Sequence, residues 1–362
     1  MVKDKNMERQ LATIQRIAEV SPIEGADRIE KIRINDWWCV TEKGNFKVDD
    51  LCVYFEIDSL LPVSNPAFSF LARGSKPKKM NIDGVEHVGY RLKTIRLRGQ
   101  VSQGLALPLT SLFPSLEGVD LSSGKMIGDD VTNVLEIVKY EAPVPANLEG
   151  KVKGNFPGFI PKTDEERVQN MGEIIKSHIG EKFYVTEKLD GSSMTVYKKD
   201  GVLGVCSRNL DLLETEGNTF WGLANRYNLK EKLPEGFAIQ GEVVGEGIQQ
   251  NPLKLTGQEF YAFSLYDINQ KAYVSQDSLV TLCQLIGAPL VPMIDSHYVL
   301  EKDAQGLLSS FNGIKSHLNP QELAEGVVFR PHAGVEVEIR GRLQRFSFKV
   351  ISNEYLLGEK DT

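Results

Sequence analysis

The sequence predicts an α+β protein of two domains, in which a small β-barrel precedes a domain of antiparallel sheets flanked by helices. The chain has 362 residues, 41% of them hydrophobic, which is enough for two cores. Residues 8–140 lack long helical periodicity, and a stretch rich in proline and glycine at residues 141–162 separates them from a region of mixed strands and helices. We therefore expect domains at residues 1–140 and 163–362, joined by a linker at residues 141–162.

The composition is that of an ordinary soluble protein. The formal net charge of −7 excludes a uniformly basic surface, so contact with nucleic acid would require a local basic patch. No signal peptide and no run of about 18 apolar residues is found, so we expect no contact with a membrane. The cysteines lack the spacing of a metal site and are expected to be reduced thiols of a cytoplasmic protein: Cys39, Cys52, Cys206 and Cys283.

The first domain is expected to consist of short strands separated by turns. β-branched and aromatic residues are frequent in the candidate strands, which are Leu11–Glu19, Ile29–Ile34, Trp38–Thr41, Leu51–Ile57, Tyr90–Leu97, Gly104–Pro108 and Val134–Tyr140. Many short strands without long helices are typical of a small barrel.

The densest basic region of the chain lies in this domain. It comprises residues 73–79 and a candidate strand in which Arg91 and Lys93, then Arg96 and Arg98, recur at alternate positions. Alternation would place several of these cations on a sheet face or rim, where they could follow a phosphate backbone. We predict that Lys93, Arg96 and Arg98 contact nucleic acid; the alternative is a solvated strand with ordinary surface charges.

A helix is expected to open the second domain. Thr163 and Glu166 have the spacing of a capping box, and Gly180 would end the helix. Two further helices, without identifiable chemistry, are expected at residues 275–286 and 301–311.

A lysine at the end of a strand is the centre of the second domain. Strand-like segments lie on either side of Lys188-Leu-Asp-Gly191, and Asp200-Gly201 is typical of a two-residue hairpin turn. The amine of lysine is protonated up to about pH 10.4, so a nucleophilic lysine needs surroundings that remove its proton. Asp190 could hold a cation nearby. The same pattern also describes an ordinary hairpin, so the lysine needs support from other residues.

Charged residues recur in later segments that are otherwise apolar. Glu242 lies inside the candidate strand at residues 237–245, Glu325 opens another strand, and Lys349 lies inside a third. A charge within an apolar strand is unfavourable unless it has a counter-ion, which favours a functional role. Carboxylates are suited to Mg²⁺ or Mn²⁺, and a buried lysine is suited to a phosphate.

Taken in order, these segments resemble the motifs of the covalent nucleotidyltransferases, the superfamily of ATP-dependent ligases and mRNA capping enzymes. The matching segments are Lys188-Leu-Asp-Gly-Ser-Ser193, Ser207-Arg208-Asn209, and residues 237–245, 260–267, 325–330 and 346–351. In that superfamily the lysine takes a nucleotide as a phosphoramidate. The Lys-Thr-Asp-Glu-x-Arg segment that ends at Arg167 also precedes the nucleophile in the resembling ligases.

The resemblance implies a role for each matching residue. Lys188 would be the catalytic nucleophile, Phe263 would pack on the purine, and Arg167 would contact the outgoing phosphates of ATP. An aromatic residue in a strand is more often part of a core, which is the alternative for Phe263. The full set of implied nucleotide contacts is Arg167, Glu187, Lys188, Arg208, Glu242, Phe263 and Lys349, and the implied metal ligands are Asp190, Glu242 and Glu325.

The order of the domains resembles one branch of this superfamily. DNA ligases and capping enzymes place an OB-fold after the nucleotidyltransferase domain, whereas only Val350–Thr362 follow Lys349 here. A barrel in first place is similar to the fifth family of RNA ligases, so the first domain is expected to be OB-like. One departure is that many ligases have two lysines in the last motif, whereas this chain has only Lys349, with Arg342 and Arg345 upstream.

This branch implies an ATP-dependent RNA ligase that joins 3'-hydroxyl and 5'-phosphate ends through a lysyl-AMP intermediate, with Mn²⁺ or Mg²⁺ as cofactor. We expect a monomer that acts on nicked duplexes of RNA or of RNA and DNA, with RNA on the 3'-hydroxyl side. Two alternatives remain, a capping-type guanylyltransferase and a non-catalytic protein that binds nucleic acid.

Overall fold

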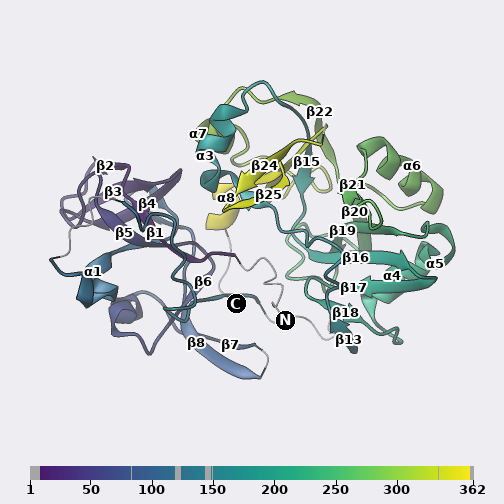
Figure 1. The fold of residues 1–362 in the computed structure, drawn as a ribbon, viewed down its shortest axis with the longest axis horizontal. Helices are drawn as coiled ribbons and strands as arrows, with labels where there is room; N and C mark the ends of the chain where they lie inside the picture. The colour runs from purple at the N-terminus through teal and green to yellow at the C-terminus, as the bar shows by residue number, and fades with distance from the viewer. Residues whose placement is uncertain are drawn as a thin grey trace. The chain divides into compact units, whose positions relative to one another are not determined.

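The computed structural model describes residues 9–358, except 83, 119–123, 143–147, 149 and 333. The chain divides into two compact units, Met1–Pro143 with Leu356–Thr362, and Val144–Tyr355. Figure 1 shows that sheets dominate both units and that the helices are short.

The first unit is built from short strands in small antiparallel sheets. Its sheets have the strand orders β1-β5-β11, β2-β3-β4, β12-β6-β8-β7 and β10-β9. The strands are β1 Ala12–Arg16, β2 Glu19–Pro22, β3 Ile29–Ile34, β4 Trp37–Glu42, β5 Leu51–Phe55, β6 Ser59–Pro62, β7 Lys78–Ile82, β8 Val85–Arg91, β9 Ile95–Leu97, β10 Gln100–Ser102, β11 Leu105–Pro108 and β12 Val138–Lys139. The short helices are η1 Pro66–Arg73, α1 Leu109–Leu112 and η2 Pro114–Leu116.

Strand β5 lies at the centre of the first unit because both of its faces are buried. Val53 and Phe55 belong to one hydrophobic cluster, and Cys52 and Tyr54 belong to another. Successive side chains of a strand point to opposite faces, so an unbroken apolar run is expected where a strand separates two cores.

Three predicted strands of the first unit are interrupted in the structure. The segment Leu11–Glu19 changes partners after Ile17. Ile17 still donates to the carbonyl of Asp50 next to β5, whereas Ala18 donates to that of Arg33 on β3. The segment Tyr90–Leu97 is divided between β8 and β9. The prediction for Val134–Tyr140 is wrong up to Ile137, because that stretch is a turn and only Val138–Lys139 pairs with β6. The strands predicted at Ile29–Ile34 and Leu51–Ile57 are confirmed as β3 and β5.

The second unit contains two larger sheets. A seven-stranded sheet has the order β13-β18-β17-β16-β19-β20-β21, and a five-stranded sheet has the order β14-β26-β23-β15-β22. The strands are β13 Val152–Asn155, β14 Glu166–Arg167, β15 Lys182–Lys188, β16 Ser192–Lys199, β17 Val202–Cys206, β18 Leu210–Leu212, β19 Phe237–Gly245, β20 Gln258–Asp267, β21 Ala272–Tyr273, β22 Met293–Val299, β23 Gly326–Pro331 and β26 Phe348–Ile351, with a separate hairpin of β24 Glu336–Ile339 and β25 Arg342–Arg345. Apart from the parallel pair β14–β26, the predicted antiparallel sheets are thus confirmed.

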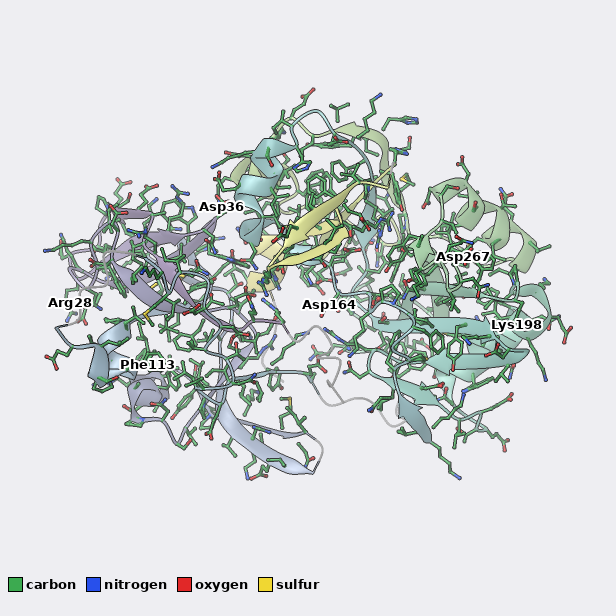
Figure 2. All side chains as sticks on the ribbon, viewed as in Figure 1. Arg28, Asp36, Phe113, Asp164, Lys198 and Asp267 are labelled. Carbon is green, nitrogen blue, oxygen red and sulfur yellow. The ribbon has the colours of Figure 1, made fainter. Side chains whose placement is uncertain are left out.

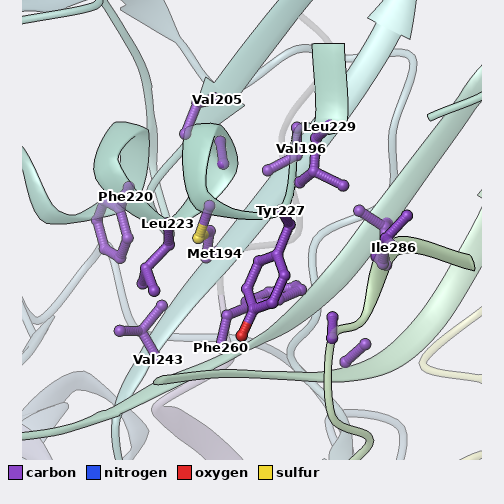
Figure 3. Packing of buried hydrophobic residues seen from close by; sticks show 14 of the residues in the cluster. Met194, Val196, Val205, Phe220, Leu223, Tyr227, Leu229, Val243, Phe260 and Ile286 are labelled. Atoms are coloured by element: carbon purple, nitrogen blue, oxygen red, sulfur yellow. The ribbon is translucent and has the colours of Figure 1, made fainter. Parts of the chain in front are cut away.

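Helices cover the apolar faces of the two sheets. In the seven-stranded sheet, Met194 and Val243 pack against Phe220 and Leu223 of α4, as Figure 3 shows. A second cluster packs the five-stranded sheet against α3 and α7. The helices of this unit are η3 Val168–Asn170, α3 Gly172–Ser177, α4 Thr219–Arg226, α5 Leu229–Lys232, α6 Gln276–Ile286 and α7 Ala304–Ser310, and α8 Asn353–Leu357 follows the last strand. The helices predicted at residues 275–286 and 301–311 are confirmed as α6 and α7.

The predicted helix between Thr163 and Gly180 is wrong over its first half, because the helix begins only at Gly172. The Thr163 hydroxyl lies 2.9 Å from that of Ser193 and does not cap a helix. The Glu166 carboxylate accepts from the Asn170 side chain, and residues 166–167 pair in parallel with β26. Pairing with a distant strand therefore overrides the local capping signal.

The segment at residues 141–162 contributes to the second unit. Strand β13 pairs with β18, and Phe156 and Ile160 are buried in a cluster with Tyr197. A strand and core residues thus lie within the stretch rich in proline and glycine. No helix among the described residues is long and apolar enough to cross a membrane.

Candidate active site

Lys188 lies where the chain passes from one sheet of the second unit to the other. Strand β15 of the five-stranded sheet ends at Lys188, and strand β16 of the seven-stranded sheet begins at Ser192. In the short connection, a Cβ atom at Gly191 would lie 2.2 Å from the carbonyl oxygen of Val243, so a side chain there would collide with strand β19. The tight connection therefore places the backbone of Lys188 at the junction between the sheets.

Three carboxylates surround this ammonium group. Glu325 lies just before β23, the strand paired with β15, and its Oε2 atom is 2.5 Å from Lys188 Nζ. Glu242 lies on β19 and Asp190 in the connection, and both carboxylates attract the Lys188 charge. Asp190 also accepts a hydrogen bond of 2.5 Å from the hydroxyl of Tyr355. The structure thus brings the predicted nucleophile together with the three predicted metal ligands.

Burial and charge act against each other at this cluster. Burial favours the neutral amine, but the three carboxylates outweigh it, so the pKa of Lys188 lies above its ordinary value. Burial and the other two carboxylates raise the pKa of Glu242 to about 8, against the effect of Lys188. The amine is therefore protonated, and its single positive charge does not fully compensate the carboxylates.

The chemistry of these side chains fits a divalent cation. Among the described residues, no group of three metal-ligating side chains is already assembled as a metal site. In the structure, the ammonium group of Lys188 is the positive charge that all three carboxylates share. Hard carboxylate oxygens in excess of their counter-charge suit Mg²⁺ or Mn²⁺ held partly through water.

Two cations of the site, Arg208 and Lys349, contact the same carboxylate. This carboxylate belongs to Asp164, to which sequence reasoning assigned no role. Arg208 lies in the loop after β17, and its Nη2 atom is 2.5 Å from Oδ2 of Asp164. Lys349 lies on β26, and its Nζ atom is 3.4 Å from Oδ1 of the same carboxylate. Asp164 is labelled in Figure 2. Arg167 is buried on β14 and pairs in register with Lys349, so both side chains leave the sheet on the same face.

Phe263 occupies an irregular position of β20. Its neighbours Ala262 and Ser264 pair with consecutive residues of β19, which leaves Phe263 as the extra residue of a β-bulge. Bulges redirect a side chain away from the regular alternation of a strand. The guanidinium carbon of Arg330 lies 5.0 Å from the centre of the Phe263 ring, and the ring packs against the cluster that contains Leu189.

Glu187 lies next to this apolar cluster and not among the carboxylates around Lys188. Neighbouring residues of a strand face opposite sides, so Glu187 and Lys188 point in opposite directions. Burial raises the pKa of the Glu187 carboxyl, whose Oε2 atom accepts a hydrogen bond of 2.8 Å from the backbone of His317. Glu187 also interacts electrostatically with Tyr261, which packs against the same cluster as Phe263.

The predicted basic strand of the first unit is a hairpin in the structure. Arg96 is exposed on β9, and Arg98 is exposed in the turn to β10, where it adopts a positive φ of 48°. Lys93 lies in the break between β8 and β9. Arg91 is not part of this exposed group, because it lies 2.8 Å from Asp58 and over the ring of Tyr140. Of the cations expected on a sheet face or rim, Arg96 and Arg98 therefore lie together at the hairpin, whereas Arg91 does not belong to this group.

Arg345, upstream of the single lysine of the last motif, contacts two tyrosines. Arg345 donates a 2.9 Å hydrogen bond to the hydroxyl of Tyr184 and lies over the ring of Tyr273. The side chain of Arg342 is outside the described part of the chain. Sequence reasoning also assigned no role to Tyr355 or Arg330. Each of these residues contacts residues that lie far away in the sequence, so no local pattern indicates the contact.

Comparison with known proteins gives a family match in each of the two units. A family model described as an OB-fold domain matches residues 11–109, and one described as RNA ligase matches residues 181–351. No curated protein matches the sequence.

Solved structures of an RNA ligase of Naegleria gruberi are similar over nearly the whole chain. A mutant with ATP and Mn is 42% identical, with a TM-score of 0.83 over 96% of this chain and 98% of that one. A mutant with AMP and Mn is 42% identical, with a TM-score of 0.84 over 98% and 100% of the two chains. The same ligase with PPi gives 42% identity and a TM-score of 0.83 over 96% and 98%. The chain therefore belongs to the RNA ligase family, in the form that has an OB-fold domain ahead of the RNA ligase domain.

Proposed function

We propose that this RNA ligase uses ATP to join 3'-hydroxyl and 5'-phosphate ends through an AMP group carried on Lys188. The observation that carries the proposal is the position of Lys188 at the junction of the two sheets, 2.5 Å from Glu325 and within the field of Glu242 and Asp190. Support comes from the similar Naegleria ligase, whose mutants are described with ATP and Mn and with AMP and Mn.

In the first step, the neutral amine of Lys188 attacks the α-phosphorus of ATP. A P–N bond forms and the P–O bond to the leaving pyrophosphate breaks. Because the carboxylates keep the amine protonated in the free protein, Lys188 must lose a proton before it attacks, and the Glu325 carboxylate lies nearest to receive it. AMP then passes to the 5'-phosphate of the polynucleotide, and the 3'-hydroxyl displaces AMP to form the phosphodiester.

The other residues of the site bind and orient the nucleotide. Arg208 and Lys349 are cations suited to its phosphates, and Arg167 would orient the pyrophosphate in line with Lys188. Phe263 and Glu187 border an apolar cluster that suits the base. A divalent cation held by Asp190, Glu242 and Glu325 would neutralise phosphate charge and lower the pKa of the nearby amine.

The polynucleotide is proposed to be a nicked duplex of RNA, or of RNA and DNA, with RNA on the 3'-hydroxyl side. The basic hairpin with Arg96 and Arg98, together with Lys93 just before it, supports contact with phosphates in a chain of net charge −7. We also infer a monomer in the cytoplasm. The four cysteines are buried thiols, as expected in a reducing compartment.

Two assays test the proposal. Incubation with radiolabelled ATP should label the protein through an acid-labile bond, whereas labelled GTP should not. Labelling by GTP alone would favour a capping-type guanylyltransferase. Sealing of nicked duplexes that carry RNA or DNA on each side of the nick would then define the substrate, and absence of both labelling and sealing would favour a protein that only binds nucleic acid.

A further inference from the structure

One carboxylate of the chain lies between the two cations that are proposed to bind the nucleotide phosphates. Asp164 contacts Arg208 through one oxygen at 2.5 Å and Lys349 through the other at 3.4 Å. A phosphate group of the nucleotide would be expected to bridge the same two cations in the way that the carboxylate does here. The Asp164 side chain is 48% exposed, so it can exchange with an anion from solution.

The segment around Asp164 connects the two sheets of the ligase domain. The residues before Asp164 bond to the seven-stranded sheet and its loops, and the residue after it bonds to the five-stranded side. These contacts are the pairs Pro161–Gln240, Lys162–Asn209, Thr163–Ser193 and Glu165–Ser347. The anchors on both sides keep the carboxylate close to Arg208 and Lys349, and no helix or strand includes residues 161–165.

A phosphate group competes well for these cations. Ion pairs of exposed side chains contribute little to stability, so the contact between Asp164 and Arg208 is readily exchanged. A phosphate carries more charge and more acceptor oxygens than a carboxylate, and it accepts from arginine and lysine together. Both anions cannot occupy the same position, because like charges at contact repel each other.

We propose that Asp164 is an internal competitor of the nucleotide phosphates. It holds Arg208 and Lys349 in the free enzyme, ATP displaces it, and it returns as pyrophosphate leaves. The inference rests on the proposed function, because that function assigns Arg208 and Lys349 to phosphates. Its consequence is that pyrophosphate is retained less tightly, which disfavours reversal of the first step.

The test is binding of inorganic pyrophosphate alone to the full chain by calorimetry, which requires no chemistry. Asp164→Asn keeps the size of the side chain and removes its charge. It should bind pyrophosphate roughly two- to fivefold more tightly than the wild type, the range expected when one exposed charge interaction is removed. Asp200→Asn is the matched control, because Asp200 is an exposed carboxylate that pairs with Lys199, and its affinity should stay unchanged.

Other results would overturn the inference. If Asp164 instead holds Arg208 in its working position, Asp164→Asn should bind pyrophosphate more weakly, and equal affinity would mean that the carboxylate does not compete. Asp164→Glu, which keeps the charge, should bind as weakly as the wild type, and tight binding by this variant would also contradict competition. Labelling of the wild type by ATP distinguishes failure of this inference from failure of the proposed function. If the wild type is labelled but Asp164→Asn does not bind pyrophosphate more tightly, only this inference is rejected. If the wild type is not labelled, the proposed function is rejected.

Discussion

Lys188 is the residue at which the charges of the site meet, and its surroundings keep its amine protonated in the free protein. The three carboxylates raise the pKa of its ammonium group despite burial. An amine in this state is a cation that stabilises its neighbours and not a nucleophile. Reaction therefore requires that positive charge from another source, such as a bound divalent cation, compensates the carboxylates.

Replacement of Lys188 by alanine should abolish labelling by ATP. The variant has no amine to form the P–N bond, whereas sealing of a nick that already carries AMP does not need that bond. The measurement is acid-labile radiolabel on the protein, with Lys198→Ala as control, because Lys198 is a lysine of the same domain that donates to the backbone of Lys230. Label that persists in Lys188→Ala would assign the nucleophile to another residue.

Binding of Mg²⁺ should depend on pH through Glu242. Its pKa of about 8 in the folded protein lies above the ordinary value of 4.5, so the stability that its protonated form contributes is lost as the pH rises through about 8. Mg²⁺ binds the ionised carboxylate, so the rise in melting temperature caused by Mg²⁺ should increase from about pH 7 to about pH 9. In Glu242→Gln this dependence should disappear. A dependence that survives in the variant would mean that another group titrates with the metal.

At the scale of single residues, the sequence predicts those whose chemistry is unusual for their position. Lys188, Glu242 and Glu325 are charges in or next to apolar strands, and the structure brings them together. Asp164 and Tyr355 are ordinary surface residues by sequence. Asp164 contacts Lys349, and Tyr355 contacts Asp190. In each pair the two residues are more than 160 positions apart in the chain, so only the folded structure could reveal these contacts.

At the scale of elements, local signals succeed where the element depends on local contacts. Helix α6 has its own cap at Ser275 and ends at Gly287 with a positive φ, and both signals are visible in the sequence. The Asp200-Gly201 turn also has positive φ at both residues, as a two-residue hairpin requires. The segment at residues 163–171 failed because its partners are Ser193 and β26, which no local pattern encodes.

The hairpin of β9 and β10 should contribute to the binding of nucleic acid through the positive charges of Arg96 and Arg98. Combined Arg96→Gln and Arg98→Gln should weaken binding of a nicked duplex most strongly at low salt, because each phosphate contact releases counter-ions. The slope of the logarithm of affinity against the logarithm of salt should fall by up to about 2. Arg28→Gln is the control, since Arg28 is an exposed arginine of the same unit outside the hairpin. An unchanged slope in the double variant would make the hairpin an ordinary solvated surface.

At the scale of the whole molecule, each unit has hydrophobic clusters of its own. The first unit is held by the clusters around Phe55 and Trp37, and the second by those around Phe220 and Phe329. The order of a barrel and a ligase domain was predictable from the sequence, because strand periodicity and motif order are both properties of long segments. The regular structure within residues 141–162 was harder to predict, because β13 lies inside the stretch rich in proline and glycine and has no local signal.

The separation of the cores leads to a test of how the two units share the reaction. Deletion of the first unit, leaving residues 141–362, should preserve formation of the lysyl adenylate, because its reactants are ATP, a metal ion and residues of the second unit. Labelling by ATP also serves as the control for folding of the fragment. Joining should be impaired on the order of a hundredfold or more, since the 3'-hydroxyl must be oriented in line with the 5'-phosphate and loss of orientation removes much of the rate. The measurement is sealing of a pre-adenylylated nick by the fragment and by the full chain over a range of salt. Equal sealing rates at every salt concentration would show that the first unit does not hold the substrate, and the hairpin with Arg96 and Arg98 would then have no part in joining.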